Sequence, residues 1–198
     1  NERVEFEHNQ QVQSSLQDVR NGVLRTAATG RTSPTTVPLG TRYPTRVVAV
    51  NPPPSTGRLA TDSSGEVTLV DATAVDGETA DYWNGTDRSY TTRQLVYTPN
   101  YNIYRSAPRT VYDNTVLHNE FDGDDRTVTG QRLLEGNLIY VVTLNGSLAR
   151  SGTAVSVDPT PVSTSDRAVA VTGTDIAIET DTELSEEEWR RLLEDQYE

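Results

Sequence analysis

The segment Val12–Val23, VQSSLQDVRNGV, spaces its apolar residues as one face of an α-helix does. These residues recur at intervals of four, three and four: Val12, Leu16, Val19 and Val23. Polar residues, Arg20 among them, occupy the other faces. From Glu2 to about Ala28 the chain has no Pro and a single Gly, so we expect one amphipathic helix that ends by Gly30.

The middle of the chain has the pattern of β-structure. Between about residues 32 and 181, Thr and Val dominate and the helical spacing disappears. Short runs of alternating or continuously apolar residues are typical of strands. The runs are Arg46–Val50, Glu66–Val70, Gln94–Thr98, Thr110–Leu117, Leu138–Leu144, Thr153–Val157, Arg167–Thr172 and Asp175–Glu179.

An Asn-Gly dipeptide follows the most apolar of these runs. Asn-Gly between two strand-like runs is typical of a type I′ hairpin turn. We therefore expect Leu138–Leu144 to pair with Ser147–Ser151 around Asn145-Gly146.

The last segment has the signals of a second helix. Ser185 and Glu188 match a capping box, and Leu184 and Trp189 are spaced for the hydrophobic staple around it. Pairs of opposite charge at i and i+4 add to the helix signal. They are Glu186 with Arg190 and Glu187 with Arg191.

These patterns predict a mainly β protein with flanking helices, of the α+β class. We expect a long N-terminal amphipathic helix packed on an antiparallel β-sandwich or open barrel, and a short C-terminal helix. The expected parts are a helix at residues 1–30, a β-rich head at 31–182 and a helix at 183–198. Together they form one structural domain.

The charge composition indicates a high-salt environment. The chain has 29 acidic residues against 17 basic ones, a net charge of −12, and every basic residue is Arg. Acidic side chains keep a protein soluble when salt screens its repulsion, so we interpret the source as halophilic. The chain lacks the basic face that nucleic acid or anionic lipid needs, so we expect neither as a partner.

The stability of the fold is expected to depend on salt. A net charge of −12 makes the compact state repel itself at low ionic strength. We expect the melting temperature, measured by calorimetry, to rise as salt increases from millimolar to molar concentration. A constant melting temperature over that range would contradict the halophilic interpretation.

Several classes of site lack their residues or motifs. Cys is absent, which excludes disulfides, thiolate chemistry and zinc sites built on Cys. The chain has no Gly-rich nucleotide loop, His-Glu-x-x-His motif or nucleophile elbow. We therefore expect no enzyme activity, catalytic residue, cofactor or catalytic metal. No run reaches the roughly 18 apolar residues of a membrane span, so we expect any anchor to precede Asn1 or follow Glu198.

Two His residues and one acidic cluster are the remaining candidates for chemistry. His8 falls on the predicted first helix and His118 at the end of a predicted strand. A catalytic triad needs a nucleophile beside one of them. Asp122, Asp124 and Asp125 are weak candidates for Ca²⁺ ligands, because they lack the spacing of an EF-hand and the Asp-Gly pair among them equally fits a turn.

A segment rich in Tyr and Arg, Tyr97–Tyr112, is the best candidate binding face. Tyr and Arg are enriched at protein interfaces, and Tyr rings also stack on sugars. The alternative is that alternate Tyr side chains pack on a half-buried sheet. The candidate residues are Trp83, Tyr97, Tyr101, Tyr104, Arg105 and Arg109.

Two N-glycosylation sequons fall on predicted turns, one at Asn84 and one at Asn145. A chain this rich in Ser and Thr is expected to contain sequons by chance. The predicted hairpin also accounts for Asn145 without a glycan.

Four segments resemble a group of haloarchaeal cell-surface proteins of unassigned function. They are EFEHNQQVQSSLQDVRNGV (5–23), LGTRYPTRVVAVNPPPSTG (39–57), NYNIYRSAPRTVYDNTVLHNEF (100–121) and NGSLARSG (145–152). The resemblance covers nearly the whole chain and implies a type IV pilin-like layout. In that layout an N-terminal membrane helix continues into an amphipathic helix, which packs on a β-rich head outside the cell. This chain matches the second half of the pattern, and it lacks the apolar segment and the processing site.

The sequence supports three functional hypotheses. The first is the extracytoplasmic head of a membrane-anchored, pilin-like surface protein, with protein partners and self-assembly through the first helix. The second is a β-sandwich module that binds a glycan or a surface partner through its Tyr-rich face. The third is a secreted hydrolase that uses His118. Exposure of the aromatic residues and the hydrogen-bond partners of the two His residues distinguish these hypotheses.

Overall fold

The computed structural model describes residues 1–45, 52–165 and 167–194. It is mainly β, with antiparallel sheets and two helices, which confirms the prediction at that level. In chain order the elements are α1 (Glu2–Thr29), β1 (Thr35–Pro38), β2 (Thr56–Val70), β3 (Thr73–Ala74), β4 (Arg88–Asn100), β5 (Arg109–Asp113), β6 (Val116–Phe121), β7 (Asp124–Thr127), β8 (Leu134–Glu135), β9 (Leu138–Ile139), β10 (Ala149–Gly152), β11 (Ala154–Val157), β12 (Val171–Thr172), β13 (Ala177–Thr180) and α2 (Glu186–Glu194).

A long antiparallel sheet forms the body of the molecule. Its strands run in the order β10-β2-β4-β5-β6-β7. β4 pairs with one edge of β2 along nearly its whole length, and the other edge of β2 pairs with β10 at its start and with β13 at its end. A register shift between Asp62 and Ser64 marks a β-bulge in β2. Three short two-stranded pairs, β1-β11, β3-β12 and β8-β9, complete the β-structure of the described residues.

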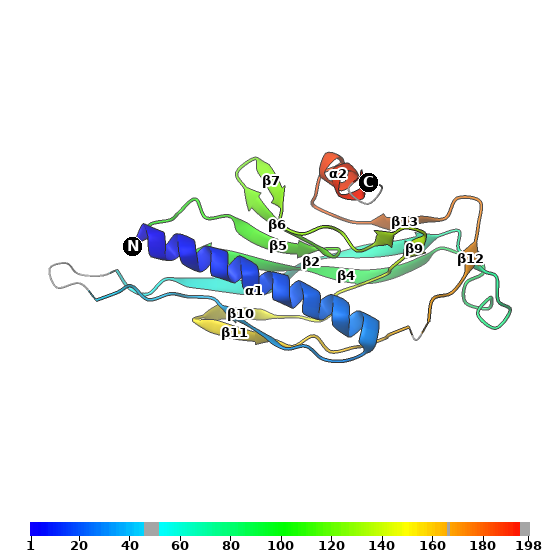
Figure 1. The fold of residues 1–198 in the computed structure, drawn as a ribbon, viewed down its shortest axis with the longest axis horizontal. Helices are drawn as coiled ribbons and strands as arrows, with labels where there is room; N and C mark the ends of the chain where they lie inside the picture. Colours follow the sequence, from blue (N-terminus) through cyan, green and yellow to red (C-terminus); the bar gives the residue numbers. More distant parts are fainter. Residues whose placement is uncertain (46–51, 166, 195–198) are drawn as a thin grey trace.

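Helix α1 runs along the length of the elongated molecule (Figure 1). Its four stripe residues are all buried, as predicted. They form one core with Val37, Leu39, Leu59, Leu95, Tyr97, Tyr112, Leu117 and Val155. The helix ends at Thr29, and Gly30 caps it in the left-handed conformation at a φ of +68°. This burial of one apolar face supplies most of the stability of such a helix.

Helix α2 packs on the opposite face of the sheet from α1. Val116 belongs to one buried cluster with Leu184 and Leu192, against which Trp189 packs, whereas the next residue, Leu117, belongs to the α1 core. Successive side chains of a strand point to opposite faces, so the two helices cover different sides of β6.

The start of α2 matches its predicted capping signals in part. The Glu188 backbone N–H donates to the Ser185 hydroxyl at 3.2 Å, which is one half of the capping box. The Glu188 carboxylate binds Arg191 instead of completing the box. Both predicted i,i+4 ion pairs form, Glu186 with Arg190 at 2.7 Å and Glu187 with Arg191 at 2.5 Å.

The predicted strand Thr110–Leu117 is wrong, because a tight turn divides it into β5 and β6. Asn114 and Thr115 have φ angles of +45° and +73°, the signature of a type I′ turn. Asn visits this region readily, but a β-branched residue rarely does, so the Asn-Thr pair carries little turn signal.

The predicted hairpin of Leu138–Leu144 with Ser147–Ser151 is also wrong. Leu138–Ile139 pairs with Leu134–Glu135, and Ala149–Gly152 pairs with the start of β2. The residues on either side of Asn145-Gly146 hydrogen-bond to β4 and β2 rather than to each other. Near its bulge the sheet offers free backbone groups, and these compete successfully with hairpin pairing.

The other predicted strands have three outcomes. The runs in β2, β4 and β11 are confirmed within longer or slightly shorter strands, and Asp175–Glu179 corresponds to β13 with shifted ends. Only Val171–Thr172 of the run Arg167–Thr172 forms a strand. The predicted strand Arg46–Val50 lies outside the described residues.

Candidate functional site

Polar residues extend the packed face of α1 beyond the apolar stripe. Glu5, His8 and Asn9 are buried toward its N-terminal end, and Arg20 and Thr26 toward its C-terminal end. They follow the spacing of the stripe, so the packed face of α1 is polar toward its N-terminal end, whereas toward its C-terminal end Arg20 and Thr26 alternate with Val19 and Val23. The structure thereby corrects the prediction that Arg20 lies on an outer face.

Glu5 attaches the N-terminal end of α1 to the loop between β4 and β5. Its fully buried carboxylate accepts hydrogen bonds from the backbone N–H groups of Asn102 (2.9 Å), Ile103 (2.9 Å) and Tyr104 (2.6 Å). The Tyr43 hydroxyl donates a further, short hydrogen bond to it. Successive N–H groups that converge on one anion form a nest. We call this arrangement the Glu5 lock.

The donors of the Glu5 lock keep the carboxylate ionised. Burial raises the pKa of Glu5, but the hydrogen bonds from Tyr43 and from the three backbone N–H groups outweigh it. The pKa of Glu5 therefore lies below its ordinary value of 4.5. The Asn102 side-chain amide connects the segment at Pro53 to the Glu5 lock. It donates to the Tyr43 hydroxyl at 2.8 Å and to the Pro53 carbonyl at 2.9 Å.

Arg20 makes a second polar attachment, which we call the Arg20 lock. Its Nε donates to the Thr115 carbonyl at 2.6 Å and its Nη2 to the Gly130 carbonyl at 2.7 Å. Thr115 belongs to the β5–β6 turn, and Gly130 lies in the segment after β7. The guanidinium therefore joins α1 to two separate parts of the β-structure, in a geometry that suits its rigid fork of donors.

Two of the candidate binding residues, Tyr97 and Tyr101, are buried beside the Glu5 lock. The Tyr101 hydroxyl lies 2.7 Å from His8 Nδ1 and 3.4 Å from the Tyr97 hydroxyl. Tyr97 is fully buried and Tyr101 is 8% exposed, so neither belongs to an exposed face. For these two residues the structure matches the alternative prediction, in which Tyr packs on the sheet.

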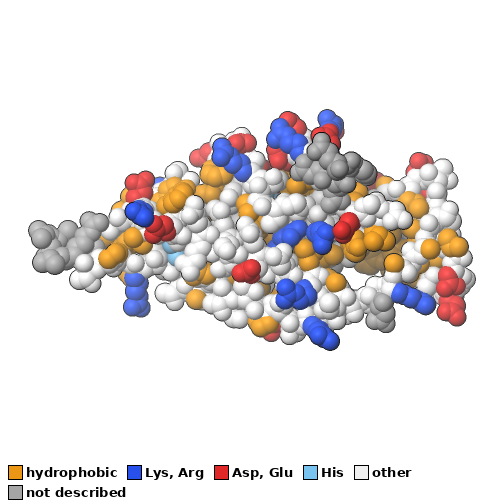
Figure 2. Space-filling view, in the orientation of Figure 1, with side chains coloured by type: hydrophobic (Ala, Val, Ile, Leu, Met, Phe, Trp, Pro, Cys, Tyr) orange, Lys and Arg blue, Asp and Glu red, His pale blue; other side chains and the backbone are white. Residues whose placement is uncertain are grey.

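Tyr104 and Arg105 line a shallow polar cleft next to the Glu5 lock. The cleft has a volume of about 410 Å³ and is lined by Pro99, Asn100, Tyr101, Asn102, Tyr104, Arg105 and Ala107. Phe6 packs edge-on against Tyr104 at 5.7 Å between ring centroids. Hydrophobic side chains are exposed at this end of the molecule, as they are elsewhere along the face in Figure 2, and here Phe6 and Ile103 are 45% and 44% exposed. The cleft offers amides, hydroxyls and one guanidinium, which suits hydrogen bonding to a polar ligand.

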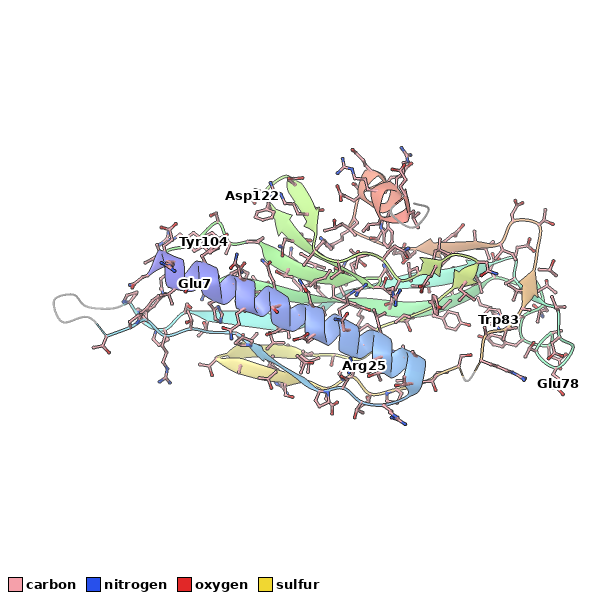
Figure 3. All side chains as sticks on the ribbon, in the orientation of Figure 1. Glu7, Arg25, Glu78, Trp83, Tyr104 and Asp122 are labelled. Carbon is pink, nitrogen blue, oxygen red and sulfur yellow. The ribbon has the colours of Figure 1, made fainter. Side chains whose placement is uncertain are left out.

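The remaining candidates do not join this cleft. Trp83 lies at the opposite end of the molecule from Tyr104 (Figure 3), where it packs edge-on against Tyr82 at 4.9 Å. Arg109 forms an ion pair with Glu120 at 2.9 Å. The single Tyr-rich face predicted from the sequence is therefore divided: Tyr97 and Tyr101 are buried, Tyr104 and Arg105 line the cleft, and Trp83 and Arg109 lie outside it.

The three Asp residues proposed as calcium ligands lie at the tip of the β6–β7 hairpin (Figure 3). Gly123 forms the turn at a φ of +89°, and Asp124 pairs with Arg126 at 3.6 Å. Among the described residues, no group of three or more His, Asp or Glu is placed to hold a metal ion. The Asp-Gly pair in this cluster forms the turn between β6 and β7.

The two His residues have no catalytic partners within the described part of the chain. His8 Nδ1 contacts a Tyr hydroxyl, and neither ring nitrogen of the fully buried His118 has a hydrogen-bond partner. A hydrolytic His needs a nucleophile and an orienting group within hydrogen-bond reach. The hydrolase hypothesis required such a partner, and the described residues provide neither His with one within hydrogen-bond reach.

His118 is expected to make the fold less stable in mild acid. Burial lowers its pKa below 6.5, although the carboxylates of Asp113, Asp125 and Glu183 act to raise it and Arg109 acts to lower it. The unfolded chain then binds the proton more readily than the folded one, so stability falls as the pH drops through 6.5 toward the folded pKa.

A His118→Leu variant tests this prediction. Because neither ring nitrogen has a partner, an apolar side chain of similar size should maintain stability at pH 7. Between pH 7 and pH 5.5 the melting temperature of the native protein should fall more steeply than that of the variant. The burial-raised pKa of Asp113 acts in the opposite direction in both proteins. An equal fall in melting temperature between pH 7 and pH 5.5 in the two proteins would contradict the prediction.

Comparison with protein-family models, curated proteins and solved structures found no match to this chain. Neither described helix is both long and apolar enough to cross a membrane.

Proposed function

We propose that this chain is the exposed head of a membrane-anchored, pilin-like surface protein of a halophilic archaeon. In this proposal α1 joins the head to an anchor helix, and the head acts outside the cell as a structural or interaction domain rather than as an enzyme. Its partners are other surface proteins or further copies of itself. We also propose that residues 31–182 form a β-sandwich or an open barrel, as predicted from the sequence.

The attachment of α1 is the observation that carries the proposal. The apolar stripe packs α1 on the sheet and the Glu5 lock binds its N-terminal end. The Arg20 lock lies within the stripe, between Val19 and Val23, and binds the helix to two further segments. A force along α1 is thus distributed over the β4–β5 loop, the β5–β6 turn and the segment at Gly130. This arrangement suits a helix that transmits load between an anchor and a head.

The position of α1 also supports its proposed connection to an anchor helix. Its N-terminal end lies near one tip of the elongated molecule (Figure 1), so a helix continuing in that direction would leave the head along its long axis. The net charge of −12 and the absence of Lys support a protein exposed to high salt.

The polar cleft beside Tyr104 and Arg105 supports a second candidate, a tethered module that binds a glycan or a surface partner. Burial of Tyr97 and Tyr101 removes two of the aromatic residues on which that hypothesis depended. We therefore rank it below the structural role.

Fractionation of cells that express the full-length gene product tests the proposal. Intact cells of a halophilic host would be treated with trypsin, because the chain has Arg residues but no Lys for amine labelling. Sheared surface filaments, detergent-soluble membrane and cytosol would then be probed for the head. A cytosolic protein that serves as a loading marker provides the control for intact cells.

Each fraction has a defined consequence. Trypsin-sensitive protein in sheared filaments supports the pilin-like role. Trypsin-sensitive protein only in the dispersed membrane fraction supports the tethered binding module instead. Protein that is protected from trypsin and recovered from the cytosol would overturn both candidates.

A further inference from the structure

Two sequons are exposed on turns of the fold, Asn84-Gly85-Thr86 and Asn145-Gly146-Ser147. An oligosaccharide transferase must draw the tripeptide into its active site so that the Asn side-chain nitrogen becomes reachable. A tripeptide that is hydrogen-bonded to a sheet must first give up those bonds. The two sequons differ in this respect.

The sequon at Asn84 is tied to β3. Asn84 forms an antiparallel bridge with Thr73, and the preceding residue, Trp83, accepts a hydrogen bond from the Ala74 N–H at 2.8 Å. The Gly85 N–H donates to the Ala72 carbonyl at 3.1 Å. Moving this tripeptide into an active site would therefore break the pairing along β3.

The sequon at Asn145 is not hydrogen-bonded to the sheet within the described residues, whereas the residues on either side of it, Leu144 and Leu148, are. Leu144 accepts a hydrogen bond from the Arg93 N–H at 2.8 Å, and Leu148 accepts one from the Thr61 N–H at 2.8 Å. Between them, the only hydrogen bond within the described residues joins the Gly146 N–H to the Asn145 side-chain oxygen at 2.7 Å.

The tip also has room to move. Gly146 has a φ of +100°, and no atom lies within 4 Å of the position that a Cβ would take there. The tripeptide can therefore change conformation without disturbing the sheet, while Leu144 and Leu148 keep their places at the edge of the α1 core.

We propose that Asn145 is N-glycosylated on the folded protein and that Asn84 is left unmodified. The proposal rests on the proposed function, because the glycan donor is reached only outside the cytoplasm. In the reaction, the Asn145 side-chain nitrogen attacks the anomeric carbon of an oligosaccharide carried as a polyprenyl phosphate ester. The new C–N bond replaces the C–O bond to phosphate, the lipid phosphate leaves with the bonding electrons, and a base of the transferase takes the amide proton.

Tryptic peptides separate the two sites. Cleavage after Arg gives residues 133–150, which contain the Asn145 sequon, and residues 59–88, which contain the Asn84 sequon. The full-length protein would be isolated from the envelope of a halophilic host and both peptides analysed by mass spectrometry. We expect a sugar mass on residues 133–150 and an unmodified peptide 59–88.

Variants at the exposed tip provide matched controls. Asn145→Gln and Ser147→Ala should remove the modification, whereas Ser147→Thr retains the sequon and should maintain it. Asn137→Gln changes an Asn outside any sequon in the same peptide and should leave the sugar mass unchanged.

The outcomes separate this inference from the proposed function. An unmodified peptide 133–150 on envelope-located protein would overturn the glycosylation proposal alone. Equal modification of both sequons would overturn the selectivity for Asn145. Recovery of the protein from the cytosol would overturn the proposed function and, with it, this inference.

Discussion

Replacement of Glu5 by Ala should lower the free energy of unfolding by about 3 kcal/mol, because it removes a charged acceptor from several buried donors. Three backbone N–H groups and the Tyr43 hydroxyl lose their shared acceptor. Chemical denaturation at constant high salt measures the change. Glu7→Ala is the matched control, because Glu7 is exposed on the same helix and pairs with the exposed Arg3. We expect little change in that variant.

The Glu5 lock also has a pH signature. The pKa of Glu5 is below its ordinary value of 4.5, so its stabilising contribution is present above that value and is lost as the pH falls through the folded pKa. The native protein should therefore lose stability on acidification below 4.5, and Glu5→Ala should lose less. Hydrogen exchange of the amides of residues 102–104 should be faster in the variant. Unchanged exchange and unchanged stability would show that the lock contributes nothing.

Replacement of Arg20 by Met should cost about 2 kcal/mol, because it keeps the alkyl packing and leaves two backbone carbonyls without their donor. Loss of the hydrogen bond to the Thr115 carbonyl should cost more than loss of the one to the Gly130 carbonyl, since Thr115 has a strained φ of +73° in the β5–β6 turn. Its hydroxyl also accepts a hydrogen bond from the Arg132 N–H at 2.9 Å, which helps to hold the turn.

Arg25→Met is the control for Arg20→Met. Arg25 is exposed on α1 (Figure 3), so the substitution removes a charge of the same kind without breaking a contact to the β-structure. Equal denaturation midpoints for the two variants would contradict the Arg20 lock.

The candidate binding residues show where sequence reasoning is limited. Alternation in Tyr97–Tyr112 indicated strand structure, which is confirmed at the two ends of the segment, in β4 and β5, whereas residues 101–108 form the loop between them. The alternation could not show which side of the sheet α1 would cover. That choice buries Tyr97 and Tyr101 and leaves Tyr104 at a cleft. Trp83 is close to Tyr97 in sequence, yet a long antiparallel strand carries the two to different parts of the molecule.

Local spacing and capping chemistry were sufficient to predict α1, the start of α2 and parts of β2, β4, β11 and β13, because these patterns depend on neighbours within a few residues. Only the tertiary structure decided the β5–β6 turn, the partners of residues 144–148 and the burial of Glu5 and Arg20. The partners of those two side chains lie 97 and 95 residues away, at Asn102 and Thr115. A polar residue on an amphipathic helix can be buried only where the folded chain supplies its hydrogen bonds, and a helical period carries no information about such distant partners.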